Sequence, residues 1–324
     1  MPSLRSTSLP RQLLENERPP LAAVVVADVA AAFTEGPADD GQGRVFFTDI
    51  LNSRILCFDT RTGQTTVWRA DSGRSNGLLF DPQGRLLCCE GSEFGPGGRR
   101  RITRTDLASG RVEVLTDRFD GVKYNSPNDI AACSDGSIYF TDPCYGDRTT
   151  MQLSHESVYR IDPAGKVTRV LSQPDIDRPN GVALSPDETT LFVVDSCPTP
   201  GGNRKIWAFA RADDGALSDR RLVYDFAPGR GGDGMAIDHQ GMLYIAAGVQ
   251  TPRGAFETSD VPPGIYCMTP AGGLLGRIPI PQDLITNVTF GGPDLRTLWI
   301  TAGNTLFTHR TTTPGFVIHR RSAG

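Results

Sequence analysis

NSPNDIAACSDGSIYFTDP (Asn125–Pro143) and RPNGVALSPDETTLFVVDS (Arg178–Ser196) are two copies of one pattern. Each copy has a polar turn containing Pro-Asn, a short apolar run, a second polar turn, and another apolar run that ends before an Asp. The two Pro-Asn pairs place their Asn residues at 128 and 180, which is a separation of 52 positions. Self-similarity at a fixed period is the signature of a repeat architecture.

The same pattern occurs six times along the chain. The other four copies begin at TEGP (Thr34–Pro37), SNGLLFDPQGRLLCCE (Ser75–Glu90), GDGMAIDHQGMLYIAAG (Gly232–Gly248) and ITNVTFGGPDLRTLWITAG (Ile285–Gly303). Each unit contains four short β-type runs rich in Val, Ile, Phe, Tyr and Leu, separated by turn residues. No segment combines helical periodicity with caps, so helices should be scarce. Six units of four strands predict an all-β fold, a six-bladed β-propeller with a central channel.

The predicted domain organisation is an N-terminal extension over residues 1–20 and a single propeller domain over 21–324. The apolar run LAAVVVADVAAAF (Leu21–Phe33) is too short to span a membrane, and the charged residues and prolines before it do not suit a secretory signal. We expect this run to add a strand to the last blade and so close the ring. A two-sheet sandwich is the competing fold, but it would not predict six copies of one pattern.

Composition limits the classes of partner. The 324 residues are 38% hydrophobic and 22% charged, with a net charge of −4 and no long basic run, so we expect neither nucleic acid nor membrane as a partner. Seven Cys without Cys-x-x-Cys spacing argue against a disulfide scaffold or a zinc site. They favour reduced thiols in a cytoplasmic protein. The composition makes no prediction of oligomeric state.

One position of the repeat must converge in such a fold, because the first strand of every blade lines the central channel. The residues at this position, called the ring residues below, are Glu35, Asn76, Asn128, Asn180, Asp233 and Asn287. Any one Asn or Asp could be a turn residue only. A purely structural position, however, would include aliphatic or small residues among six copies. Two carboxylates converging near one axis would also repel each other without a cation.

The chemistry of the ring residues indicates which cation. Carboxylate and amide oxygens without His or Cys favour calcium, magnesium or manganese over zinc or copper. Two carboxylates match a divalent charge, and the six to eight ligands that calcium takes leave room for water and substrate. We therefore expect one divalent cation, calcium first, with magnesium, manganese or zinc as alternatives.

A family resemblance rests on several motifs together. They are TEGP (Thr34–Pro37), NSPNDI (Asn125–Ile130), FTDPCYG (Phe140–Gly146), RPNGVALSPDE (Arg178–Glu188), GDGMAID (Gly232–Asp238) and TFGGPD (Thr289–Asp294). On these motifs the chain, from about Phe33 to Phe307, resembles the gluconolactonase family, which includes senescence marker protein (regucalcin) and luciferin-regenerating enzymes. The resemblance implies a six-bladed propeller that binds a divalent cation and hydrolyses sugar lactones. It also implies a metal site of Glu35, Asn128, Asn180 and Asp233, with Asp233 as the acid/base.

The expected substrate contacts surround this metal site. Asn76 and Asn287 are not needed as ligands and are expected to hydrogen-bond water or sugar hydroxyls. Tyr145 and Asp147, at the end of the FTDPCYG motif and just after it, are further candidates, with a surface loop acid as the alternative for Asp147. Ser126 stands where animal members that resemble regucalcin carry an Arg, a pattern typical of bacterial-type sugar lactonases. This departure leaves the identity of the sugar open.

The resulting hypothesis is calcium-dependent hydrolysis of aldonolactones such as gluconolactone. The metal would polarise the lactone carbonyl, and Asp233 would act as acid/base on water. A phosphotriester or other ester hydrolase could use the same site, and a non-catalytic calcium- or protein-binding propeller is the alternative of another class. The segment Gly73–Gly77 matches the Gly-x-Ser-x-Gly elbow of serine hydrolases, but it lies between two β runs, where that motif requires a helix after the Ser.

Overall fold

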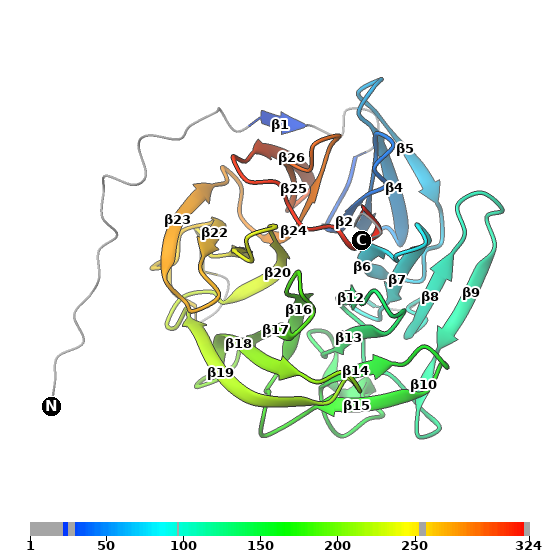
Figure 1. The fold of residues 1–324 in the computed structure, drawn as a ribbon, viewed down its shortest axis with the longest axis vertical. Coiled ribbons are helices and arrows are strands. Elements are labelled where there is room, and N and C mark those ends of the chain that lie inside the picture. The colour runs from blue at the N-terminus through cyan, green and yellow to red at the C-terminus, as the bar shows by residue number, and fades with distance from the viewer. Residues whose placement is uncertain (1–21, 25–29, 96, 253–256, 321–324) are drawn as a thin grey trace, which may run out of the picture.

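The computed structural model of the chain describes residues 22–24, 30–95, 97–252 and 257–320. The expected extension over residues 1–20 lies outside these described residues. Six four-stranded antiparallel sheets are arranged in a ring around a central channel (Figure 1). The fold is a six-bladed β-propeller, which confirms the prediction from the repeat.

Each blade runs from an innermost strand at the channel to an outermost strand at the rim. Blade 1 comprises β2 (Thr34–Asp39), β3 (Arg44–Asp49), β4 (Arg54–Asp59) and β5 (Gln64–Arg69). Blade 2 comprises β6 (Ser75–Phe80), β7 (Leu86–Glu90), β8 (Arg101–Thr105) and β9 (Val112–Thr116). Blade 3 comprises β12 (Ile130–Ala132), β13 (Ile138–Asp142), β14 (Ser157–Ile161) and β15 (Val167–Leu171).

The second half of the ring repeats this order. Blade 4 comprises β16 (Pro179–Leu184), β17 (Thr190–Ser196), β18 (Arg204–Arg211) and β19 (Leu217–Asp225). Blade 5 comprises β20 (Gly232–Ile237), β21 (Leu243–Ala247), β22 (Gly264–Met268) and β23 (Leu274–Pro279). Blade 6 comprises β24 (Ile285–Gly291), β25 (Thr297–Ala302), β26 (Thr305–Arg310) and β1 (Ala22–Val24).

Elements outside the blades are few and short. A hairpin of β10 (Arg118–Phe119) and β11 (Val122–Lys123) lies between blades 2 and 3 in the sequence. The helices of the described residues are single 3₁₀ turns, η2 (Arg148–Thr150) and η3 (Ile318–Arg320). Within that part of the chain, no helix therefore approaches the length needed to cross a bilayer.

The first and last strands of the described residues pair in blade 6. Strand β1 pairs antiparallel with β26, with Ala23 opposite Phe307, and so supplies the outermost strand of the last blade. This pairing confirms the expectation that the N-terminal apolar run closes the ring. Blades 1 and 6 are also joined at the channel, where the Thr286 hydroxyl donates to the Thr34 carbonyl oxygen at 2.9 Å.

The core lies between neighbouring blades. All five residues of β7 and of β21 are buried, because these second strands are covered by a blade on each face. The outermost strands are largely exposed, as in β9. All seven Cys are free and six are buried, and burial raises the pKa of the Cys88 thiol to about 12. The buried Cys side chains pack as small core residues.

The segment after β26 returns to the channel and covers one end of it (Figure 1). The Phe316 N–H donates to the Ile237 carbonyl oxygen of blade 5 at 2.9 Å. At the other end of this segment, the His319 ring packs on Phe80 of blade 2 with a centroid distance of 5.2 Å. The propeller therefore has one covered end, and five of the six ring residues line a cavity outside it.

Candidate active site

Five of the six ring residues lie at irregularities in the innermost strands. In blade 1, Glu35 pairs with Thr48 but the next paired residue of β2 is Ala38, so the register shifts immediately after Glu35. Equivalent shifts occur at the start of the innermost strands of blades 2, 4, 5 and 6. A β-bulge re-aims the side chain beside it. In blades 1, 2, 4 and 5 the shift re-aims the ring residue beside it, whereas Asn128 of blade 3 lies in the segment just before β12.

Glycine follows four of the ring residues because successive innermost strands approach too closely for a side chain. A Cβ on Gly36 would lie 2.3 Å from the Asn76 carbonyl oxygen, and one on Gly181 would lie 2.3 Å from the Asp233 carbonyl oxygen. Real Cβ atoms do not make such contacts. The Gly in TEGP, SNG, PNG and GDG is thus what allows the ring residues to converge.

Carboxylates at the ends of the second strands hold the segments that lead into the ring residues. Asp142, the last residue of β13, accepts from the backbone N–H groups of Asn125 at 2.8 Å and Ser126 at 2.7 Å. Asp195 in β17 accepts in the same way from the Arg178 N–H at 2.8 Å. The Asp that ends the second apolar run of the repeat therefore fixes the backbone two residues before Asn128 and Asn180.

Five ring residues line one cavity of about 370 Å³, a size typical of small-molecule sites. They are Glu35, Asn76, Asn128, Asn180 and Asp233. The four residues expected to ligate a metal therefore lie together at one end of the channel. Tyr145 lines the same cavity, as do Phe33 and Phe94, whose rings are in contact with a centroid distance of 5.2 Å.

Two of the sequence-predicted substrate contacts do not line this cavity. Asn287 faces a second cavity nearer the covered end of the channel, and its Oδ1 accepts from the Val288 N–H at 2.8 Å. Asp147 is exposed and does not line the cavity of the ring residues. Its carboxylate accepts from the Thr149 N–H at 2.9 Å and caps η2. The register shift at the start of β24 sets the position of Asn287. The turn that begins η2 sets the position of Asp147.

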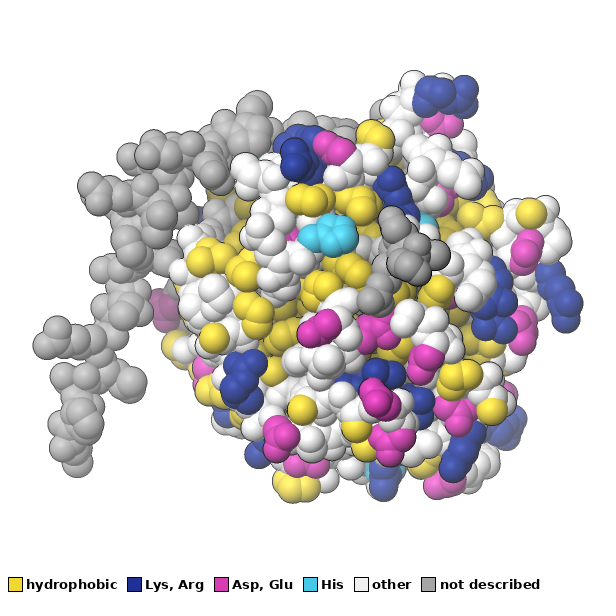
Figure 2. Space-filling view, in the orientation of Figure 1, with side chains coloured by type: hydrophobic (Ala, Val, Ile, Leu, Met, Phe, Trp, Pro, Cys, Tyr) yellow, Lys and Arg dark blue, Asp and Glu magenta, His cyan; other side chains and the backbone are white. Residues whose placement is uncertain are grey.

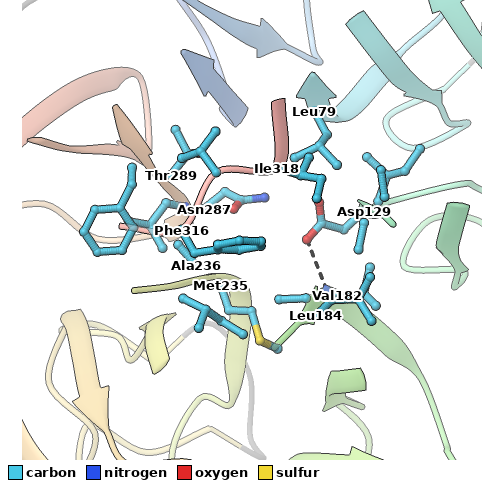
Figure 3. A pocket seen from close by; sticks show the side chains of 18 of the residues that line it. Leu79, Asp129, Val182, Leu184, Met235, Ala236, Asn287, Thr289, Phe316 and Ile318 are labelled. Carbon is cyan, nitrogen blue, oxygen red and sulfur yellow. Dashed lines mark hydrogen bonds between the residues drawn. The ribbon is translucent and has the colours of Figure 1, made fainter. Parts of the chain in front are cut away.

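The second cavity has a volume of about 100 Å³ and a mostly apolar lining. Figure 3 shows Asp129 and Asn287 as the polar side chains that approach each other inside it, with Phe316 and Ile318 of the C-terminal segment alongside. Asp129 takes the place that Gly has in four other blades, and burial raises the pKa of its carboxyl to about 7. Figure 2 shows apolar side chains gathered in the middle of this covered face, with charges of both signs around them.

The carboxyl groups of the main cavity interact unfavourably. Burial, followed by the charge of Asp233, raises the pKa of Glu35 well above its ordinary value. The same two causes raise the pKa of Glu93 to about 7. Glu93 accepts from the Asn76 amide at 3.3 Å. A cation bound among these groups would relieve the repulsion.

Glu93 and Arg230 are cavity residues that the sequence did not single out. Glu93 belongs to the connection between β7 and β8, outside the repeated positions, so no periodicity marks it. Arg230 forms an ion pair with Oδ2 of Asp233, and its other nitrogen donates to the Ile285 carbonyl oxygen at 2.9 Å. The signal in the sequence that could have identified Arg230 is its position three residues before Asp233.

The donor set fits a divalent cation. Among the residues that the structure describes, no three His, Cys, Asp or Glu side chains form a metal-binding group. A cation held by Glu35 and Asp233 would take its remaining protein ligands from the amide oxygens of Asn128 and Asn180, which line the same cavity. Hard oxygen donors with two negative charges suit calcium better than zinc.

The possible serine elbow is not one. Ser75 is the first residue of β6, its hydroxyl donates to the Ser72 carbonyl oxygen at 2.7 Å, and a strand follows it. The strand-to-helix turn that exposes the nucleophile of serine hydrolases is absent at this position. Ser75 is a buried structural residue.

Comparison with known proteins agrees with this architecture. A protein of Zymomonas mobilis named gluconolactonase is 32% identical over 254 residues, and the match covers 74% of this chain but 64% of the relative, less than two thirds of its length. A pentonolactonase of Haloferax volcanii is 26% identical, with 85% of this chain and 83% of the relative covered. The solved structure of a gluconolactonase from Xanthomonas campestris superposes with a TM-score of 0.73 at 34% identity, covering 91% of this chain and 89% of that one. The model of the family described as SMP-30/Gluconolactonase/LRE-like matches residues 33–304, so the chain belongs to this family.

Proposed function

We propose that the chain is a calcium-dependent hydrolase of sugar lactones such as gluconolactone. The observation that carries the proposal is the convergence of Glu35, Asn128, Asn180 and Asp233 on one cavity of about 370 Å³. Relatives named gluconolactonase and pentonolactonase support the substrate class. Seven free Cys support a reducing, cytoplasmic compartment.

The cavity walls match a sugar lactone. Phe33 and Phe94 supply an apolar wall for the C–H face of the ring. Asn76 and Glu93 offer an amide and a carboxyl group to the hydroxyls. Substrate sites of this kind combine an apolar lining with a few polar groups that fix orientation.

In the proposed reaction, Asp233 and Arg230 have separate roles. Calcium, when bound, supplies Lewis-acid stabilisation to the negative charge that develops on the lactone carbonyl oxygen. The Asp233 carboxylate takes a proton from the water that attacks the carbonyl carbon, and it returns that proton to the ring oxygen as the C–O bond breaks. The ion pair with Arg230 holds Asp233 in the orientation needed for both transfers.

The test is hydrolysis of a panel of aldonolactones, aryl esters and phosphotriesters by the full-length protein after chelation. Calcium, magnesium, manganese and zinc are then added back singly. We expect aldonolactone hydrolysis to vanish with the chelator and to return most fully with calcium. Full lactone hydrolysis by the metal-free protein would overturn the proposal.

The same panel separates the alternatives. Preference for aryl esters or phosphotriesters would indicate another hydrolase built on the same donor set. Calcium binding without turnover of any compound would indicate a binding protein.

A further inference from the structure

We infer that Tyr145 is a positioning residue that orients the Asn180 amide so that its carbonyl oxygen faces the cation site. The inference rests on the proposed function, since it concerns a ligand of the proposed metal. It also changes the role expected for Tyr145, from a substrate contact to a support for a ligand.

The chemical need arises because a carboxamide has two unlike ends. Only Oδ1 can coordinate a cation, while the NH₂ end carries partial positive charge and repels it. A half-turn about the last side-chain bond exchanges the two ends at little steric cost. An Asn ligand therefore requires a neighbour that accepts a hydrogen bond from Nδ2 and cannot offer a proton in return.

Tyr145 meets this requirement through its own hydrogen bond. Its phenol donates to the backbone carbonyl oxygen of Ser196 at 2.9 Å. A carbonyl oxygen can only accept, so the one phenolic proton is committed to Ser196. Toward Asn180 the Tyr145 oxygen then presents lone pairs, and it accepts from Asn180 Nδ2 at 3.1 Å. The Ser196 carbonyl oxygen therefore sets the donor and acceptor roles of both hydrogen bonds, from Asn180 to Tyr145 and from Tyr145 to Ser196.

The ring of Tyr145 is itself fixed between two blades. The Arg178 guanidinium lies over this ring at 5.5 Å from its centroid and forms an ion pair with Glu156 at 2.8 Å. Glu156 in turn accepts from the Cys144 N–H at 2.7 Å, next to Tyr145 in the chain. The connection after β13 of blade 3 is thus clamped onto blade 4, which carries Asn180. Supports of this kind around metal ligands orient them and raise metal affinity.

The test is the calcium dissociation constant of the full-length Tyr145→Phe variant, measured by titration calorimetry. Phe keeps the ring under Arg178 and removes only the oxygen that accepts from Asn180. We expect calcium to bind about 10- to 100-fold more weakly than to the wild-type protein. Thermal unfolding in chelator checks that the variant is folded.

Tyr139→Phe is the matched control. The Tyr139 phenol is also buried and also donates to a backbone carbonyl oxygen, that of Gly215 at 3.0 Å, but it does not line the cavity. The same atom is removed, and we expect wild-type calcium affinity. A drop equal to that of Tyr145→Phe would contradict the inference.

A second comparison uses Asn180→Asp. A carboxylate presents oxygen at both ends and needs no orientation, so adding Tyr145→Phe to Asn180→Asp should weaken calcium binding by less than about threefold. An equal loss in both backgrounds would mean that Tyr145 does not act through the Asn180 amide.

The possible failures are distinguishable. If Tyr145→Phe binds calcium like the wild type and has a raised KM for the lactone, Tyr145 is a substrate contact and only this inference fails. If the wild-type protein binds calcium but hydrolyses no lactone, the proposed function fails while the calcium constants still decide this inference. If the wild-type protein binds no divalent cation, both are overturned.

Discussion

Arg230 and Asp233, three residues apart, are joined by an ion pair at the wall of the main cavity. Both residues are buried, and Arg230 is anchored by the Ile285 carbonyl oxygen of the next blade. Arg230, which the neighbouring blade holds in place, therefore orients Asp233, the acid/base proposed for the reaction. This relationship suggests the first two predictions.

Asp233→Asn should abolish most of the lactone hydrolysis. The amide cannot take a proton from water, so we expect kcat to fall by about 10²- to 10⁴-fold, the usual contribution of a general base. The measurement is steady-state kinetics on the aldonolactone identified by the panel. Asp294→Asn removes a carboxylate from an exposed ion pair with Arg310 and should leave kcat unchanged. Full activity in Asp233→Asn would remove this residue from its proposed role.

Arg230→Gln should lower kcat more than it changes KM. The variant keeps Asp233 but removes the group that holds its Oδ2, and small misplacements of a reacting group cost about 10²-fold in rate. The kinetics are again measured at saturating calcium, with partial recovery expected for Arg230→Lys. Equal kcat in the wild type and Arg230→Gln would show that Asp233 is oriented by other contacts.

Gly181→Ala should destabilise the propeller through the channel. Its Cβ would lie 2.3 Å from the Asp233 carbonyl oxygen, and overpacking of this kind costs about 1–3 kcal/mol or more in the free energy of unfolding. Gly276→Ala is the control, because no heavy atom lies within 4 Å of its Cβ position in β23. Urea unfolding of both variants provides the comparison. Equal stability of the two would contradict the close approach of blades 4 and 5.

Glu156→Gln should unfold at a much lower denaturant concentration than the wild type. Glu156 and Arg178 are both buried, and removing one partner of a buried ion pair costs about 3–5 kcal/mol because the other charge is left uncompensated. Glu113→Gln, in the exposed pair with Arg104, is the matched control and should cost at most about 1 kcal/mol. A Glu156→Gln variant as stable as this control would show that Arg178 finds other compensation.

Acidification should weaken the fold through His319. Burial, followed by the charge of Arg320, lowers the pKa of this ring to about 4 against the opposing effect of Asp40 and Asp81, and in the described residues neither ring nitrogen has a hydrogen-bond partner. Between pH 6.5 and 4 the unfolded chain takes up a proton that the folded protein does not. The stabilisation is therefore complete above pH 6.5 and is lost as the pH falls toward 4, by about 3 kcal/mol.

The measurement is the free energy of unfolding of the wild type and of His319→Phe at several pH values across this range. The Phe variant should lose that part of the pH dependence, since it has no group to protonate. Parallel curves would show that His319 does not contribute.

The sequence alone determined the fold and most of the ring. Six copies of one pattern require a closed array, and equivalent positions of a closed array must meet at its axis. Glu35, Asn128, Asn180 and Asp233 could therefore be brought together from their place in the repeat, without knowledge of any distance. The role of the N-terminal run followed in the same way, because a ring of blades needs a strand to close it.

Only the tertiary structure decided what surrounds the ring. Glu93 and Phe94 belong to a connection between strands, where no periodicity records which way a side chain faces. The structure places Asp147 on the surface although it lies two residues after Tyr145. It also turns Asn287 toward the second cavity, despite its equivalent place in the repeat. A repeat fixes where the backbone of each blade meets the axis, whereas local bulges and contacts between blades fix the direction of each side chain.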